Sequence, residues 1–119
     1  MSLSLVPLTR CLCSGFFILP MTFDYSSSNR RWQRLRKRAL ERDGYRCREA
    51  IRYGRIEQAT HVHHIWPAEE YPEFAYCLWN LISLTQANHE AMHHKTTRKL
   101  TALGLRWQSR TPPRSDLEG

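Results

Sequence analysis

The chain has 119 residues, of which 41% are hydrophobic, and its formal net charge at pH 7 is +7. This length allows one domain with a modest core, and the hydrophobic content argues against wholesale disorder. The charge favours a polyanionic partner, although a basic protein without such a partner would have the same composition. The spacing of the four cysteines, Cys11, Cys13, Cys47 and Cys77, does not indicate a disulfide framework, and a reducing cytoplasm suits them better.

The first segment, residues 1–29, is expected to be an amino-terminal extension outside the fold. Residues 3–20 are apolar, but Pro7 and Arg10 interrupt them, so the run is too short for a transmembrane helix. An extension from an upstream start codon is our interpretation, and a signal peptide stays open. A serine-rich linker then ends at Asn29, a residue type that favours a helix N-cap.

A basic amphipathic helix is predicted over residues 30–42, because four apolar residues recur on one helical stripe: Trp32, Leu35, Ala39 and Leu40. Asp43 and Gly44 are expected to end it. Its other faces carry the candidate nucleic-acid-binding residues Arg30, Arg31, Arg34, Arg36, Lys37 and Arg38. Their self-repulsion favours contact with phosphates over a merely solvated helix surface.

The remaining elements are predicted from alternation, turn residues and caps. The first are a turn-rich connection over 45–55 with a short strand, a strand over 59–65, a loop over 68–79 and a strand over 81–84. A helix then begins at Gln86, is capped by Thr85 and carries His89 and His93. A helical piece over 97–103 follows and is closed by Gly104. Residues 105–119 are expected to form a C-terminal tail. The order strand, loop, strand, helix predicts one compact α+β unit.

All six histidines lie between residues 61 and 94: His61, His63, His64, His89, His93 and His94. His89 and His93, four residues apart, would share one face of a helix. Imidazole is the commonest protein metal ligand, and its pKa near neutrality suits a general base. This region could therefore supply both a divalent metal and a base that activates water, as a metal-dependent phosphodiesterase requires. His61 is expected to lie either on the surface or behind the metal ligands, and His94 is expected to face solvent.

The residues that carry this pattern are Trp32, Leu35-Arg36, Ala39 to Cys47, Val62-His63-His64-Ile65, Pro67, Asn80 to Leu84, His89 and His93. In order and spacing they resemble an HNH endonuclease over roughly residues 30–95. The resemblance implies an α+β fold of the ββα-metal type, preceded by the basic helix, within a domain over 30–104.

The resemblance also implies roles for individual residues. His64 would be the general base for the attacking water, and Asn80 would hold the loop and orient His64. His63, His89 and His93 would be the metal ligands. Strand alternation alone would place His63 and His64 on opposite faces, so the role of His63 rests on the resemblance.

The expected cofactor is one divalent metal ion. An all-histidine ligand set favours Zn²⁺, Ni²⁺ or Mn²⁺ over Mg²⁺, which prefers oxygen. Mg²⁺ stays open if Glu69 or Glu70 lies nearby.

One departure from the family concerns its structural zinc, which many members hold with two Cys-x-x-Cys pairs. The four corresponding places here are Cys47, Ala50, Thr85 and Asn88. Because a tetrahedral zinc needs about four ligands, no structural zinc is expected. Apolar packing must then stabilise the fold, with Cys47 and Cys77 as buried thiols.

The function implied by the resemblance is metal-dependent hydrolysis of DNA phosphodiester bonds. DNA is the expected partner, no membrane is expected, and a cytoplasmic location is expected. Nicking or double-strand cutting, a homodimer, and a phage packaging partner all stay open. Two rivals remain: a non-catalytic nucleic-acid-binding domain that keeps a metal for structure, and a toxin-type non-specific nuclease.

Overall fold

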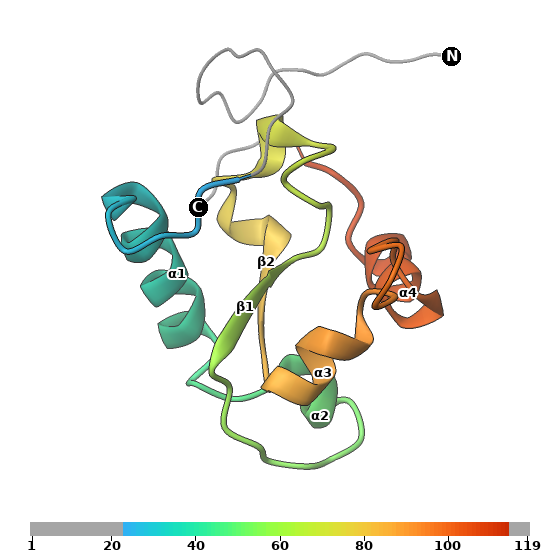
Figure 1. The fold of residues 1–119 in the computed structure, drawn as a ribbon. Helices are drawn as coiled ribbons and strands as arrows, with labels where there is room; N and C mark the ends of the chain where they lie inside the picture. The colour runs from blue at the N-terminus through green and yellow to red at the C-terminus, as the bar shows by residue number, and fades with distance from the viewer. Residues whose placement is uncertain (1–22, 115–119) are drawn as a thin grey trace.

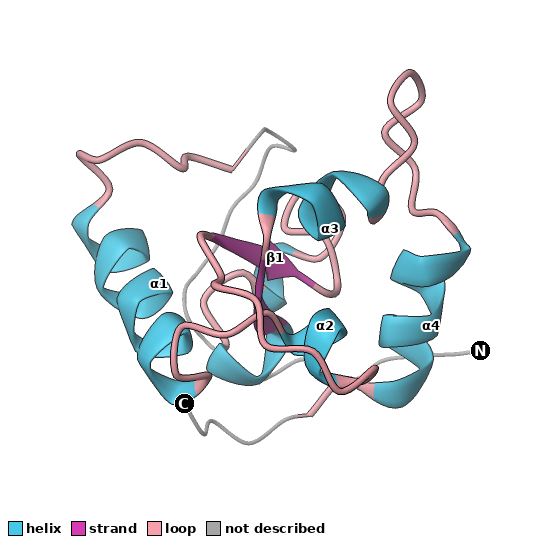
Figure 2. Cartoon of the chain, turned by 90° about the horizontal axis from the view of Figure 1, so that it is seen from below, coloured by secondary structure: helices cyan, strands magenta, loops and turns pink. Residues whose placement is uncertain are grey.

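The computed structural model describes residues 23–114. Its elements are α1 (Arg30–Arg42), α2 (Arg48–Ile51), β1 (His61–His64), the 3-10 turns η1 (Pro72–Phe74) and η2 (Leu78–Asn80), β2 (Leu81–Leu84), α3 (Gln86–Ala91) and α4 (Ala102–Arg110). Figures 1 and 2 show α1 and α4 on opposite sides of the two strands. The predicted α+β class is confirmed. The expectation for residues 1–22 lies outside the described residues. Within residues 23–114, no helix is long and apolar enough to span a membrane.

Helix α1 has the predicted bounds because both of its ends are defined by local chemistry. The Asn29 side chain accepts a hydrogen bond from the Trp32 backbone N–H at 3.1 Å, which caps the first turn. At the other end Gly44 has φ +64°, a left-handed conformation that suits glycine and stops the helix. The four predicted apolar residues of its stripe are all buried.

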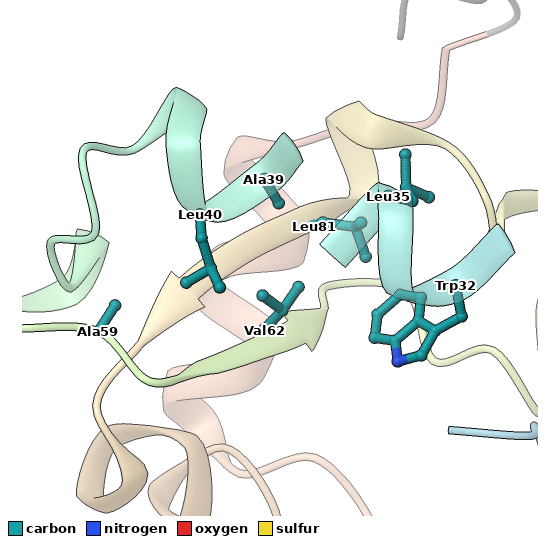
Figure 3. Packing of buried hydrophobic residues seen from close by; sticks show 7 residues of the cluster. All are labelled: Trp32, Leu35, Ala39, Leu40, Ala59, Val62 and Leu81. Atoms are coloured by element: carbon teal, nitrogen blue, oxygen red, sulfur yellow. The ribbon is translucent and has the colours of Figure 1, made fainter. Parts of the chain in front are cut away.

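The strands β1 and β2 form a two-stranded antiparallel sheet in which His61 pairs with Leu84 and His64 with Leu81. One face packs on α1 through the buried cluster Trp32, Leu35, Ala39, Leu40, Ala59, Val62 and Leu81 (Figure 3). The other face packs under α2, α3 and α4 through Cys47, Ala50, Ile65, Ile82, Leu84, Met92 and Trp107. Because successive strand residues point to opposite faces, this small sheet separates two apolar clusters.

The carboxylate of Asp43 joins α1 to the sheet. It is 3% exposed and accepts hydrogen bonds from Arg42 Nε at 2.8 Å, from Arg48 Nη1 at 3.2 Å and from the Ser83 backbone N–H at 3.1 Å. Burial alone would raise the pKa of Asp43, but the hydrogen bonds and the positive charges of Arg42 and Arg48 lower it below its ordinary value. With these hydrogen-bond partners, the buried carboxylate of Asp43 stabilises the fold while it is ionised.

Two helices differ from the sequence-based expectation. A short helix, α2, lies within the stretch predicted as turn-rich. The predicted helical piece over 97–103 is wrong, because the helix there is α4 (Ala102–Arg110) and Gly104 lies inside it. A Cβ at Gly104 would lie 2.8 Å from both the Met92 carbonyl oxygen and Leu100 Cδ2. This glycine therefore serves close packing of backbones and not helix termination.

Two aromatic residues outside the predicted bounds of 30–104 pack against the core. Trp107, in the stretch predicted as a tail, is buried, and its Nε1 donates to Glu49 Oε1 at 2.9 Å. Phe23, in the predicted extension, packs against the α1-side cluster. Aromatic burial at both ends thus ties these segments to the core, a long-range effect that local sequence does not show.

The expectations for the two cysteines in the described residues have different outcomes. Cys47 is a free, fully buried thiol, as expected, and its Sγ accepts a hydrogen bond from Asn88 Nδ2 at 3.2 Å. The expectation that Cys77 is a free thiol is wrong, because Cys77 is disulfide-bonded. Two of the four places compared with the family's zinc ligands have other structural roles here: Ala50 is buried in the second cluster, and Thr85 caps α3.

Candidate active site

A cleft of about 1260 Å³ runs along β1. Within the part of the chain that the structure describes, β1 pairs with β2 alone, so its other edge has no neighbouring strand. The cleft is lined by His61, His63 and His64 of β1, by Gln33 and Arg36 of α1, and by His89, His93 and Arg98 from the C-terminal half. Side chains from both faces of the sheet therefore reach one cavity.

The three predicted metal ligands lie together in this cleft. The ring centroid of His63 lies 5.6 Å from that of His89 and 5.3 Å from that of His93. The centroids of His89 and His93 are 6.3 Å apart. His93 lies just beyond α3, which ends at Ala91, and its backbone forms an isolated bridge with Leu100. The expectation that His93 continues the helix is thus wrong, although the turn still brings its ring to His63.

The hydrogen bonds of these rings leave nitrogen lone pairs directed at no protein group. His63 Nε2 is buried and has no hydrogen-bond partner among residues 23–114. His93 Nδ1 lies 3.3 Å from the Arg98 carbonyl oxygen, which can only accept, so Nδ1 carries the proton and Nε2 keeps its lone pair. Such a carbonyl partner orients histidines that bind metals.

Burial favours the neutral form of two of these imidazoles, His63 and His89. Desolvation lowers the pKa of His63 well below its ordinary value, and the charges of His89 and His93 act in the same direction. Desolvation, together with the smaller effects of His61 and His93, lowers the pKa of His89 to about 4. Neutral imidazole is the form that binds a metal ion.

Imidazole nitrogens are donors that suit a divalent ion, but the side chains are not yet in the positions of ligands. Among the described residues, no group of three or more His, Cys, Asp or Glu side chains is placed so that it could hold a metal ion as it stands. Two imidazoles that share one tetrahedral ion through nitrogens at about 2 Å have centroids roughly 5 Å apart. The separations from His63, 5.3 and 5.6 Å, are close to that value, and the unpartnered His63 Nε2 is the buried polar atom that an ion would satisfy.

His64 points to the opposite face of β1 and stacks on Trp32, with centroids 5.0 Å apart and an interplanar angle of 23°. Its Nε2 lies 2.9 Å from the Ala75 carbonyl oxygen, so Nε2 carries the proton and Nδ1 is the acceptor. The Tyr25 hydroxyl lies 3.4 Å from this Nδ1. Desolvation lowers the pKa of His64 to about 4, while the bond to Ala75 acts in the opposite direction.

Asn80 holds the loop between the strands through side-chain hydrogen bonds to the backbone of Trp66 and Phe74. It is fully buried, and its Oδ1 accepts from the Trp66 backbone N–H at 2.7 Å. Its Nδ2 donates to the carbonyl oxygens of Trp66 at 3.0 Å and Phe74 at 3.1 Å. Because Phe74 precedes Ala75, Asn80 places the carbonyl group that fixes the tautomer of His64.

The basic residues of α1 are divided between the cleft and the outer surface. Arg36 lines the cleft and donates to the Thr60 carbonyl oxygen at 2.8 Å. Arg31 lies 4.0 Å over the Tyr76 ring, and Lys37 pairs with Glu41 at 3.9 Å. The exposed members of the predicted set are Arg30, Arg31, Arg34, Lys37 and Arg38.

Several cleft residues were not singled out by the sequence. Tyr25 comes from the stretch predicted as an extension, and its local sequence carries no functional signal. Burial, and to a lesser degree the negative charge of Glu69, raises the pKa of Tyr25 to about 12, and the positive charge of Arg98 opposes this rise. Arg98 has φ +64°, a left-handed backbone conformation. In the sequence, the basic run from Lys95 to Lys99 was the feature that could have pointed to a role for Arg98. The expected carboxylates Glu69 and Glu70 both line the cleft.

Two antiparallel strands joined by a loop and followed by a helix, with histidines on the strand and the helix, define a ββα-type site. The chain is similar to the solved structure of the HNH endonuclease of deep-sea thermophilic bacteriophage GVE2 with manganese ion, at 33% sequence identity and a TM-score of 0.52. The match covers 53% of this chain and 68% of that chain. No family model and no curated protein matches the chain. The chain therefore belongs to the HNH-like ββα fold.

Proposed function

We propose that this chain is an HNH endonuclease that hydrolyses phosphodiester bonds of DNA with a divalent metal ion. The observation that carries the proposal is the cluster of His63, His89 and His93, with the unpartnered His63 Nε2 buried among them, in the cleft that also reaches His64. The likeness to a phage HNH endonuclease supports the same class of activity.

His64 is the general base in this proposal. Its Nε2–H bond to the Ala75 carbonyl oxygen leaves Nδ1 as the only lone pair that can accept a proton. The low pKa of His64 keeps its ring neutral at pH 7, which is the form that accepts a proton. The same low pKa makes the ring a weaker base and gives a smaller driving force for proton transfer. Stacking on Trp32 fixes the ring plane.

His63, His89 and His93 would hold the divalent ion. When bound, the ion supplies positive charge that stabilises the phosphate and the 3′ leaving oxygen. Arg36 and Arg98 line the same cleft and add positive charge that attracts a phosphate. The exposed arginines of α1, such as Arg30 and Arg34, contribute contacts to the backbone without base specificity.

The test is conversion of supercoiled plasmid to nicked or linear DNA by the purified chain with Mg²⁺, Mn²⁺, Ni²⁺, Zn²⁺ or EDTA. Wild type should cleave with at least one metal and not with EDTA, whereas His64→Ala and His63→Ala should lose at least 100-fold of the rate. His94→Ala, an exposed histidine outside the cleft lining, is the matched control and should cleave like wild type. Equal activity in His64→Ala and wild type would contradict the proposal.

A second candidate is a nucleic-acid-binding domain in which the metal serves only the fold. It is favoured by the burial of His64, which is 5% exposed and has both ring nitrogens in hydrogen bonds. This candidate predicts salt-sensitive DNA binding without cleavage in any metal. It also predicts that metal raises the thermal stability of wild type and of His64→Ala equally.

A further inference from the structure

The lone pair of His64 does not face the cleft directly. The ring is 5% exposed, its Nε2 is bonded to Ala75, and its Nδ1 is covered by the Tyr25 hydroxyl at 3.4 Å. Because Nε2 carries the only proton of the neutral ring, the Tyr25 hydroxyl must be the donor in this bond. A water molecule in the cleft therefore meets Tyr25 before it meets the Nδ1 of His64.

Tyr25 is held in this place from several sides. Its ring packs edge-on against Phe23, with centroids 4.8 Å apart, and against Trp32 at 5.5 Å. The backbone carbonyl oxygen of Tyr25 accepts from Gln33 Nε2 at 3.4 Å, which ties the segment to α1. The residue is nevertheless 48% exposed and lines the cleft. Its hydroxyl thus connects a buried imidazole to open solvent.

We propose that Tyr25 is a further catalytic residue, whose hydroxyl relays the proton of the attacking water to Nδ1 of His64. The inference rests on the proposed nuclease function and deepens it. As the water oxygen attacks phosphorus, its proton passes to Tyr25 Oη, and the proton of Tyr25 Oη passes to His64 Nδ1. The P–O3′ bond breaks with its electron pair on the 3′ oxygen, which takes a proton from solvent. The imidazolium then loses its proton to solvent through Tyr25.

Two charged residues that line the cleft act on the Tyr25 hydroxyl. Glu69 and Arg98 both interact electrostatically with Tyr25, and both line the cleft. Arg98 also fixes His93 through its carbonyl oxygen. Tyr25 therefore lines the same cleft as the residues of the proposed metal site, while its hydroxyl contacts the proposed base.

The experiment compares wild type with Tyr25→Phe in the plasmid assay, using saturating Mn²⁺ and measuring kcat and KM for DNA separately. Phenylalanine keeps the ring packing and removes only the hydroxyl. The relay predicts that kcat falls about 10-fold to 100-fold while KM stays within about two-fold. Tyr53→Phe, which changes an exposed tyrosine outside the cleft lining, is the matched control and should match wild type.

Two further measurements separate a relay from a structural role of the hydroxyl. The rate in mixtures of H₂O and D₂O should depend on the deuterium fraction with curvature in wild type, because two protons move, and linearly in Tyr25→Phe. Placing 3,5-difluorotyrosine at position 25 restores a hydroxyl and should restore kcat to within a few-fold of wild type.

If wild type cleaves DNA and the kcat of Tyr25→Phe is unchanged or higher, the relay is overturned and the nuclease proposal stands. A higher kcat would show that the hydroxyl obstructs His64. A slower Tyr25→Phe that keeps the curved dependence on deuterium would also overturn the relay. A wild type that cleaves no DNA with any metal overturns both the nuclease and the relay.

Discussion

His63 and His64 are neighbours on β1, yet His63 lies against His89 and His93 while His64 stacks on Trp32 beyond the opposite face of the sheet. Both line the same cleft, and among residues 23–114 no strand pairs with the edge of β1 that does not face β2. The two-stranded sheet thus separates the proposed metal ligands from the proposed base and still leaves both accessible to one substrate.

Loss of one imidazole should weaken metal binding. His89→Ala removes one of three clustered rings, so its affinity for Mn²⁺ should fall at least 10-fold in isothermal titration calorimetry. His94→Ala should bind Mn²⁺ like wild type, because His94 is exposed and outside the cleft lining. Unchanged affinity in His89→Ala would place the ion elsewhere.

The exposed arginines of α1 should determine the salt dependence of DNA binding. Arg30→Gln combined with Arg34→Gln should lower the slope of log K against log salt by about 2, since each lost phosphate contact removes about 1. Fluorescence anisotropy with a duplex at several salt concentrations measures this slope. Arg106→Gln on α4, on the opposite side of the strands (Figure 2), is the control and should leave the slope as it is in wild type.

Asn80→Ala should destabilise the fold before it affects chemistry. The variant leaves the backbone groups of Trp66 and Phe74 without their partners, which we expect to cost about 3 kcal/mol. Urea unfolding followed by tryptophan fluorescence measures this loss. Asn88→Ala loses one bond, to Cys47, and should cost less. Equal stability of Asn80→Ala and wild type would refute the positioning role.

Asp43 should make stability depend on acid. Its pKa in the fold is below the ordinary value of 3.8, so its contribution is present above that value and disappears as the pH falls through the pKa of the folded state. Asp43→Asn should lose about 2 kcal/mol near neutral pH. The difference in Tm between wild type and variant should stay constant above about pH 5 and shrink as the pH falls below the ordinary value of 3.8, through the lowered pKa of the folded state.

The exposed Glu73→Gln is the control for this measurement and should follow wild type at every pH. A difference in Tm between wild type and Asp43→Asn that stays constant as the pH falls would show that Asp43 acts through its shape and not its charge.

Gly104→Ala should be destabilising although alanine favours helices. The added Cβ would approach the Met92 carbonyl oxygen and Leu100 Cδ2 at 2.8 Å, and relief of this overlap should cost about 1–3 kcal/mol. Thermal unfolding by circular dichroism measures the change, with exposed Arg106→Ala in the same helix as the control. A more stable Gly104→Ala would show that the backbones can separate at no cost.

Local sequence determined the elements whose signals lie within a few residues. Asn29 and Gly44 bound α1, the apolar stripe chooses its buried face, and Thr85 caps α3. Each of these depends on hydrogen bonds or periodicity within about one or two helical turns. The same holds for β2 and for the alternation that separates His63 from His64.

Tertiary structure alone decided which distant groups meet. The burial of Trp107 against Glu49, the close approach of Gly104 to Met92, and the position of Tyr25 over His64 join residues far apart in the chain. Nothing in the neighbouring sequence of Tyr25 distinguishes it from a linker residue. Such contacts depend on packing of the whole core, which local propensity does not encode.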